Sequence, residues 1–223
     1  MPETKTIGVS IILIPYNNSN RFQTRLEREI LPTIQAHPDW NFQFIIVDNS
    51  DDDKRPSYQF FDEHTLNHAI LWPGRNLLYG PAMNLALQAC EYPYFVYLCS
   101  NHGRMYNPTW IDDLINPMLQ DEKVAMTGSH YASGWGGDRF GFSSQLPKIH
   151  IQGGVFGART AIMKSYPYSM DPDWAHGASD IYQSYQLLHA GFILKDVPTV
   201  KSVWQQNLNS PQQWKYVHDY VEE

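Results

Sequence analysis

Three short apolar segments of the sequence each end in a cluster of polar residues. The clusters are Pro15-Tyr16-Asn17 after "GVSIILI", Asp48-Asn49-Ser50 after "FQFIIV", and Cys99-Ser100-Asn101-His102 after "YFVYL". Ligands of open α/β sheets bind at the carboxyl ends of the strands. If the three segments are neighbouring parallel strands, their clusters meet at one edge of the sheet and form a binding crevice.

Asp48 has the chemistry to bind a nucleoside, because a carboxylate accepts two hydrogen bonds in a fixed plane. A base or a ribose offers donors of that kind. The other interpretation is that Asp48 and Asn49 only start a turn, which both residue types favour. The local sequence is compatible with either role.

The third cluster contains no carboxylate. Mg²⁺ and Mn²⁺ prefer hard oxygen ligands, whereas Cys99 offers a soft thiol and Asn101 one neutral carbonyl oxygen. His102 adds a borderline nitrogen ligand, although a loop histidine is more often not a metal ligand. We interpret Cys99 as a small apolar residue that packs at a strand end.

Asp180 lies at the start of "SDIYQSYQLLHAG", whose pattern predicts a helix over 179–191. Asp180 is expected to be the N-cap, with Gln183 completing a capping box and Gly191 ending the helix. A carboxylate in this place can also have a functional role.

Strands alternate with helices through the first half of the chain, a pattern typical of a parallel sheet. Strands are expected at 7–16, 41–50, 67–72, 94–100 and 124–129, and helices at 19–38, 80–91 and 108–120. Pro32 is expected to kink the first helix. The second half is less regular. We expect "SGWGGDRFGF" to be a loop and "KIHIQGGVFGAR" to be a strand that is broken by Gly153 and Gly154. Further strands are expected at 192–197 and 199–204, and a helix is expected at 211–223. The sequence has no repeat or evident linker, so one α/β domain over 1–223 is expected.

The composition favours a globular protein that does not bind nucleic acid. The 223 residues carry a formal charge of −7, and phosphate backbones require a basic face. Two cysteines fit a reducing compartment. The longest apolar run is too short to span a membrane, and "MPETKT" resembles neither a signal peptide nor a lipidation motif. We expect a cytoplasmic protein that could still act at a membrane through its substrate.

Taken together, these segments resemble the family 2 type glycosyltransferases of the GT-A fold. The likeness rests on "VSIILIPYNN", "FIIVDNSDDD", "NLLYGPAMNLALQACEYPYFVYLCSN", "PTWIDDLINPM", "IQGGVFGARTAIM" and "ASDIYQSYQLLHAGF", and it covers about residues 7 to 204. It implies a Rossmann-like, mostly parallel central sheet flanked by helices. It also implies a nucleotide-binding lobe over about 1–103 and an acceptor lobe over about 104–223.

Such enzymes transfer a sugar, here a hexosyl or deoxyhexosyl group, from a nucleotide donor to a hydroxyl of a glycan or of a lipid- or protein-linked acceptor. The resemblance makes Asp180 the general base of an inverting transfer. It assigns donor binding to Pro15, Tyr16, Asn17, Asp48, Asn49, Arg75, Asn84, Cys99, Ser100 and Asn101. It assigns acceptor binding to Trp135, Gly153 and Gly154.

The chain departs from this family at the D-x-D metal motif, which Cys99-Ser100-Asn101 replaces by position. Three interpretations remain open. Asn101 and His102 hold Mn²⁺ or Mg²⁺ weakly, with help from Asp180 or His218; Arg75, Arg104 or Lys201 neutralises the leaving diphosphate without a metal; or the protein is an impaired module that binds nucleotide sugars. A dinucleotide-dependent oxidoreductase is disfavoured, because no G-x-G-x-x-G follows the first strand.

Overall fold

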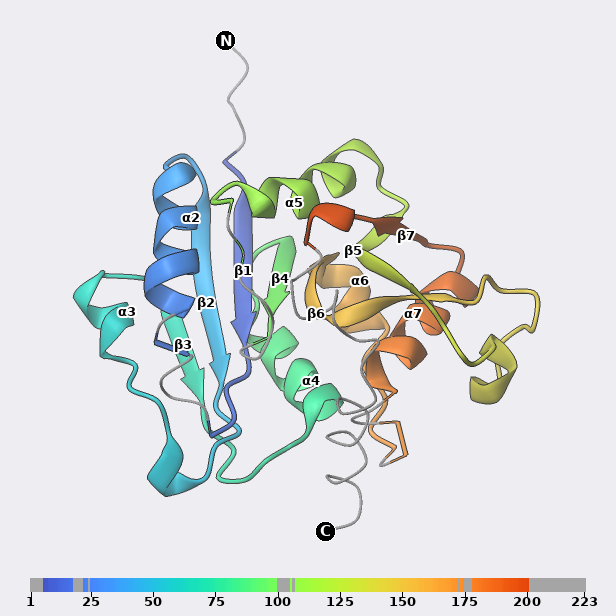
Figure 1. Cartoon of the computed structure of the whole chain (residues 1–223), viewed down its shortest axis with the longest axis horizontal. Coiled ribbons are helices and arrows are strands. Elements are labelled where there is room, and N and C mark those ends of the chain that lie inside the picture. Colours follow the sequence, from blue (N-terminus) through green and yellow to red (C-terminus); the bar gives the residue numbers. More distant parts are fainter. Residues whose placement is uncertain are drawn as a thin grey trace.

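The computed structural model describes residues 6–17, 22–23, 25–99, 105, 107–171, 173–174 and 178–200. The strands in these ranges form one seven-stranded sheet in the order β3-β2-β1-β4-β6-β5-β7 (Figure 1). They are β1 (Gly8–Leu13), β2 (Asn41–Val47), β3 (His68–Leu71), β4 (Tyr94–Leu98), β5 (Val124–Ala132), β6 (Ile149–Arg159) and β7 (Ile193–Asp196).

The sheet is mostly parallel, as the sequence predicts. Strands β3, β2, β1 and β4 pair in parallel, and β5 pairs in parallel with β7. Only β6 runs the other way among the described strands, antiparallel to both β4 and β5. From β1 the chain adds β2 and then β3 on one side, and it then returns to place β4 on the other side of β1. The strand order therefore reverses between β1 and β4. That reversal defines the crevice in which such sheets bind ligands.

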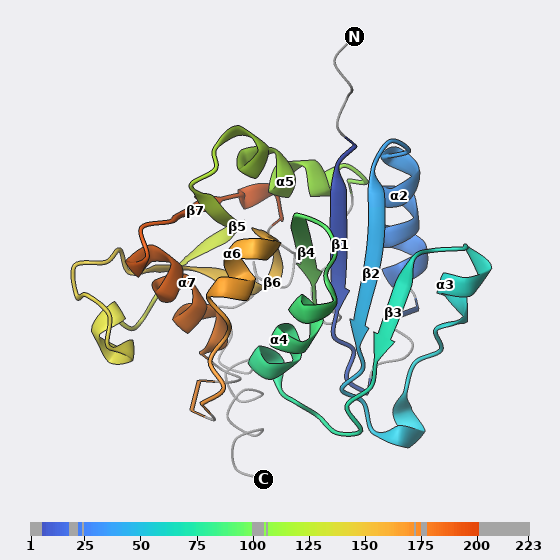
Figure 2. The same ribbon diagram turned by 180° about the vertical axis from the view of Figure 1, so that it is seen from behind.

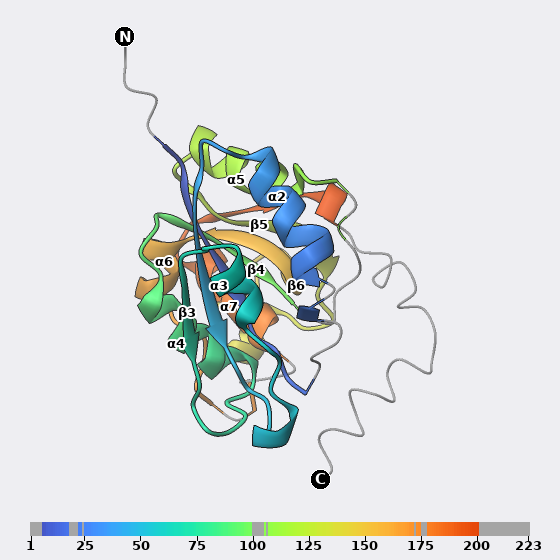
Figure 3. The same ribbon diagram turned by 90° about the vertical axis from the view of Figure 1, so that its left-hand side faces the viewer.

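Helices cover both faces of the sheet (Figures 2 and 3). One apolar core involves the π-helical turn η1 (Leu26–Ile30), α3 (Gln59–Glu63) and α5 (Trp110–Gln120), with α2 (Leu31–Ala36) packed beside it. The other involves α4 (Tyr79–Ala89), α6 (Thr160–Ser165) and α7 (Ser179–His189). Alternate residues of β4 enter the two cores, as a pleated strand requires. No helix in the described ranges is long and apolar enough to cross a membrane.

The irregularity expected at Pro32 is present as a wide helical turn. The Leu31 N–H bonds to the Leu26 carbonyl, which makes Leu26–Ile30 a π-helical turn immediately before α2. Proline has no N–H to donate and its ring crowds the preceding turn. The regular hydrogen-bond pattern therefore cannot run unchanged through this helix.

Three short 3₁₀ turns complete the described elements: η2 (Asp52–Lys54), η3 (Gly137–Phe140) and η4 (Pro198–Val200). η3 lies within the segment expected to be a loop between β5 and β6. The helix expected at 211–223 and most of the strand expected at 199–204 lie outside the described residues.

Three local expectations are wrong. Thr199 and Val200, expected to begin a strand, lie in the 3₁₀ turn η4. Strand β6 continues through Gly153 and Gly154 instead of breaking there. The N-cap of α7 is Ala178, Asp180 lies inside the first turn, and no side chain caps the helix. Gln183 instead donates to the Tyr166 carbonyl oxygen at 2.7 Å, so tertiary contacts replace the capping box. The helix end at Gly191, whose φ is +84°, is confirmed.

A buried hydrogen bond between α5 and α2 provides a test of this packing. The Trp110 indole N–H donates to the Thr33 hydroxyl at 2.9 Å, and that hydroxyl donates to the Glu29 carbonyl oxygen at 2.7 Å. Thr33→Val keeps the shape but leaves a buried donor unpaired, so we expect a loss of about 1–3 kcal/mol in urea unfolding. Thr33→Ser, which keeps the hydroxyl, should lose less. Equal stability of the valine variant and the wild type would contradict this role.

Candidate active site

The tips of β1 and β2 are joined by several hydrogen bonds. The Asn49 N–H donates to the Pro15 carbonyl oxygen at 3.0 Å, and the Asn17 N–H donates to the Ser50 hydroxyl at 3.0 Å. The Asn17 side chain, at a residue with φ of +49°, exchanges two hydrogen bonds with Asp51. The first two polar clusters therefore lie side by side, as expected from neighbouring parallel strands.

Asp48 is buried within this arrangement and has no exposed surface. Its Oδ2 accepts a hydrogen bond from Arg55 Nε at 2.8 Å, and its Oδ1 accepts one from the Ser50 N–H at 3.0 Å. Burial alone would raise the pKa of Asp48. Hydrogen bonds from its neighbours, including Tyr58 and Arg55, outweigh burial and lower the pKa below its ordinary value. Asp48 is thus a buried carboxylate paired with a guanidinium.

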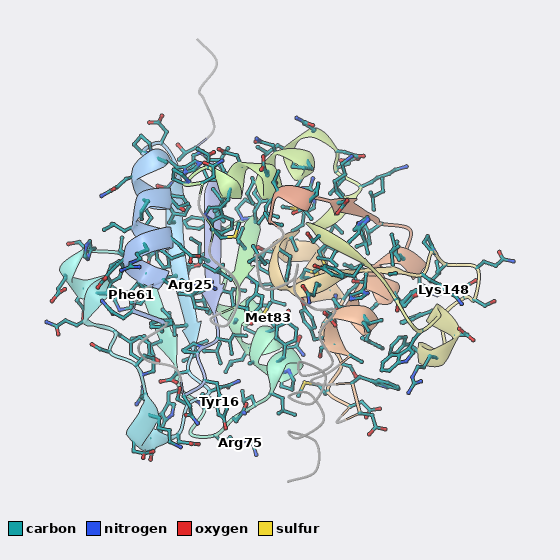
Figure 4. All side chains as sticks on the ribbon, viewed as in Figure 1. Tyr16, Arg25, Phe61, Arg75, Met83 and Lys148 are labelled. Atoms are coloured by element: carbon teal, nitrogen blue, oxygen red, sulfur yellow. The ribbon has the colours of Figure 1, made fainter. Side chains whose placement is uncertain are left out.

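Asn49 links the β2 tip to the connection between β3 and α4. Its side chain accepts from the Leu77 N–H and donates to the Leu78 carbonyl oxygen, both at 3.3 Å. Leu78 has a φ of +63°, unusual for a residue with a side chain. Arg75 in the same connection is exposed, and it lies with Tyr16 toward the carboxyl ends of the parallel strands (Figure 4).

The end of β4, the start of β6 and α7 converge. The Cys99 N–H donates to the Gly154 carbonyl oxygen at 2.8 Å, and the Gly153 N–H donates to Asp180 Oδ2 at 2.9 Å. One turn further along α7, Ser184 accepts from the Ile151 N–H at 3.0 Å. The structure therefore brings together Cys99, Gly153, Gly154 and Asp180, which lie far apart in the sequence.

Gly153 allows α4 to approach this point closely. A Cβ atom on Gly153 would lie 3.3 Å from the Tyr79 ring and 3.5 Å from the Asp180 Cβ. Tyr79 is the first residue of α4, and its ring packs edge-on against Tyr97 and Tyr168. Burial raises the pKa of Tyr79 well above its ordinary value, so its hydroxyl stays protonated beside the site.

Arg25 is a site residue that the sequence analysis missed. Its guanidinium donates to the carbonyl oxygen of Cys99 and lies 3.5 Å from the Glu29 carboxylate. Arg25 is only 6% exposed, and burial lowers its pKa. The signal for it is a charged pair, four residues apart, on the helix face that carries Leu26. Such a pair in an apolar stripe indicates a buried contact.

Asn84 is engaged with the chain that follows α6. It donates to the Tyr168 carbonyl oxygen and accepts from the Tyr168 N–H, both at 2.9 Å. It also lines a groove of about 490 Å³ between α4 and α6, with Gln88, Lys164 and Met170 among the other lining residues. These contacts fix the segment near Tyr168.

Trp135 belongs to an aromatic cluster in the second half of the chain. Its ring lies 6.1 Å from that of Trp174, which lies 4.9 Å from Phe140, and Phe140 lies 5.8 Å from Tyr182 on α7. The Arg139 guanidinium stacks 4.0 Å from the Trp135 ring centroid. The cluster is therefore joined to α7 at Tyr182, two residues beyond Asp180.

The described residues do not fit a site for a hard divalent cation. They contain no group of three or more His, Cys, Asp or Glu side chains placed to hold a metal. The predicted ligands Asn101 and His102, together with Ser100, Arg104, Lys201 and His218, lie outside the described residues. Cys99, which does lie at the strand end, offers sulfur rather than oxygen.

Comparison with known proteins shows the fold. No protein-family model and no curated protein matches the sequence. Among solved structures, a mannosyltransferase from Pyrobaculum calidifontis in complex with GDP-Man and Mn²⁺ is similar over 95% of this chain and 61% of its own, with a TM-score of 0.68 and 17% identity. S. aureus TarS is similar over 88% and 59%, with a TM-score of 0.56 and 16% identity.

A third similar structure is glucosyl-3-phosphoglycerate synthase from Mycobacterium tuberculosis in complex with Mn²⁺, UDP-glucose and phosphoglyceric acid. It matches over 86% of this chain and 69% of its own, with a TM-score of 0.56 and 15% identity. The chain spans less than two thirds of the length of the first two structures. Together with the sheet order, these similarities show that the chain has the GT-A glycosyltransferase fold.

The Asp48–Arg55 pair predicts a component of acid unfolding. Because the pKa of Asp48 is lowered on folding, the pair stabilises the protein above the unfolded value of about 3.9. That contribution is lost as pH falls through the lower folded value. We expect Asp48→Asn to be less stable than the wild type at pH 6, and the difference between the two unfolding free energies to shrink as pH falls below the unfolded value. Parallel pH profiles of the two proteins, measured by urea unfolding, would refute this assignment.

Proposed function

We propose that this protein is a glycosyltransferase that moves a sugar from a nucleotide-sugar donor to a hydroxyl group. The observation that carries the proposal is the meeting of Cys99, Gly153, Gly154 and Asp180 at one edge of a GT-A sheet. A carboxylate there lies beside the end of β4, close to where the strand order reverses. Catalysis of group transfer needs such a base within reach of the reacting centre.

In this proposal the nucleoside binds at the joined tips of β1 and β2, which carry Pro15, Tyr16, Asn17, Asp48 and Asn49. The diphosphate lies toward the end of β4, with Arg75 approaching from the β3–α4 connection. Cys99, Ser100, Asn101 and Asn84 complete the donor side. The similar structures support a nucleotide donor, since their ligands include GDP-Man and UDP-glucose.

The reaction is an inverting displacement at the sugar's anomeric carbon. The acceptor oxygen forms the new bond to that carbon, its proton passes to Asp180, and the bond to the diphosphate oxygen breaks with its electron pair. Hydrogen bonds from the Gly153 and Ile181 N–H groups to the two Asp180 oxygens fix the carboxylate's orientation. Each oxygen keeps a further lone pair for the acceptor proton.

The acceptor binds over Gly153, Gly154 and the aromatic cluster around Trp135. Flat apolar rings of this kind suit the apolar face of a sugar. We propose a cytoplasmic enzyme with a hydroxyl acceptor on a glycan or on a lipid- or protein-linked glycoconjugate. The transferred group is a hexose or a deoxyhexose.

Replacing Asp180 separates catalysis from structure. Asp180→Asn keeps an oxygen for the Gly153 N–H, so the fold and donor binding should survive, while kcat falls by about 10²–10⁴. Ser184→Ala is the matched control, because it removes the neighbouring bond to β6 but no base. It should lose stability and keep most of its turnover. Near-normal turnover of folded Asp180→Asn would limit this residue to docking α7, and retention of the anomeric configuration would exclude a single displacement.

A donor and metal titration tests the function as a whole. Candidate nucleotide sugars are screened by thermal shift, since a ligand at 100 times its Kd stabilises the folded protein by about 2.7 kcal/mol. Turnover of the best donor is then measured over a range of Mn²⁺ concentrations, with a chelator as the control. Because Cys99, Ser100 and Asn101 replace acidic ligands, we expect turnover that chelation reduces without abolishing. A sharp, tight metal requirement would contradict the weak-site prediction. Nucleotide binding without turnover of any donor would favour the alternative of an impaired binding module.

A further inference from the structure

We infer that Arg55, held by Asp48 and stacked on Trp72, is the group that reads the nucleobase, and that it selects keto bases over amino bases. This rests on the proposed nucleotide site and names the donor class that the site takes. The sequence analysis assigns Asp48, at the end of β2, to donor binding, with a base or a ribose as the group that it contacts. The structure places a guanidinium between that carboxylate and solvent.

Asp48 is not available for direct recognition. Its side chain is 0% exposed, and its two oxygens already accept from Arg55 and Ser50. Each oxygen keeps a further lone pair, but because the side chain has no exposed surface, a base could reach it only by displacing a neighbour such as Arg55, whose Nε lies 2.8 Å away. Breaking one side of such a pair leaves a buried charge without its partner, which is strongly unfavourable.

Arg55 has the opposite properties. Its side chain is 32% exposed, and the bond to Asp48 uses one of the five N–H donors of a guanidinium. The guanidinium group is held in place, because its Nε bonds to Asp48 and its Cζ lies 4.5 Å from the centroid of the Trp72 ring. An arginine fixed at two points loses little further conformational entropy when it binds a ligand.

Both residues lie at the edge where the nucleoside is proposed to bind. Trp72 directly follows β3, and the Asp48 N–H donates to the carbonyl oxygen of Leu71. Trp72 is 46% exposed, an unusual fraction for a large aromatic side chain. The loop that carries Arg55 is bonded to the β1 tip through the Asn17–Asp51 pair. The fixed cation and the exposed ring therefore face the same strand tips.

The chemistry of a guanidinium determines which bases fit. It only donates hydrogen bonds, so it matches the keto oxygen of uracil at position 4 or of guanine at position 6. Cytosine and adenine carry an amino donor at these positions, and two donors facing each other leave both unpaired. Recognition sites built on hydrogen bonding reject such analogues strongly. The predicted donor is therefore a uridine or guanosine diphosphate sugar.

The experiment measures binding of UDP, CDP, GDP and ADP to the full chain by isothermal titration calorimetry. The wild type should bind UDP more tightly than CDP, and GDP more tightly than ADP, by about tenfold or more in Kd. Arg55→Gln, whose amide both donates and accepts, should reduce each ratio to about threefold or less. Lys54→Gln is the matched control, because Lys54 is the adjacent cation and pairs with Asp51 instead. It should keep the wild-type ratios.

A second variant guards against misfolding, since Arg55→Gln leaves Asp48 buried and unpaired. Asp48→Asn with Arg55→Gln removes both charges together and should show the same loss of discrimination in a folded protein. Wild-type binding without keto preference, or discrimination that survives in folded Arg55 variants, would overturn this inference and leave the proposed function standing. Failure of all four nucleotides to bind would overturn both.

Discussion

The site depends on the overhang of β6 beyond β4. β6 pairs with β4 from Arg159 to Val155, and its earlier residues extend past the end of that strand. Among the described residues, no strand then supplies an acceptor for the N–H groups of Gly153 and Ile151 on this side, and buried backbone donors require one. Asp180 and Ser184, one helical turn apart on α7, supply it. Satisfying the backbone of β6 is thus the same interaction that delivers a carboxylate to the end of β4.

The tips of β1 and β2 are also held by side-chain hydrogen bonds. The side chains of Asn17, Asn49 and Asp48 each bond to a nearby loop or connection rather than pointing freely into solvent. Groups fixed in this way need little reorganisation when a ligand arrives, which favours binding. The cost is that several polar atoms are already used. The groups that can still bond to a ligand are the exposed ones, such as Arg75 and the exposed part of the Arg55 side chain.

Much of this arrangement follows from sequence alone, and the failures have a common cause. Alternating apolar strands and helices predict the sheet, and the rule that parallel strands share a carboxyl edge predicts that the β1 and β2 tips meet. The capping box at Asp180 fails because both of its side chains find tertiary partners, Gly153 for Asp180 and Tyr166 for Gln183. The burial of Asp48 depends on Arg55, and no local pattern encodes their contact. Local sequence patterns therefore fail to predict the role of a side chain where that side chain bonds to a residue distant in the sequence.

At the end of β4 the described residues place an arginine and not a group of metal-binding side chains. A divalent-cation site gathers carboxylates, whereas here the Cys99 carbonyl oxygen already accepts from the Arg25 guanidinium. Glu29, the carboxylate beside that guanidinium, is paired with it. Because Arg25 and Glu29 neutralise each other, a buried ion pair without net charge lies beside this end of β4. The ion pair therefore fixes the helix that follows β1 against the end of β4, through the hydrogen bond from the guanidinium to the Cys99 carbonyl oxygen.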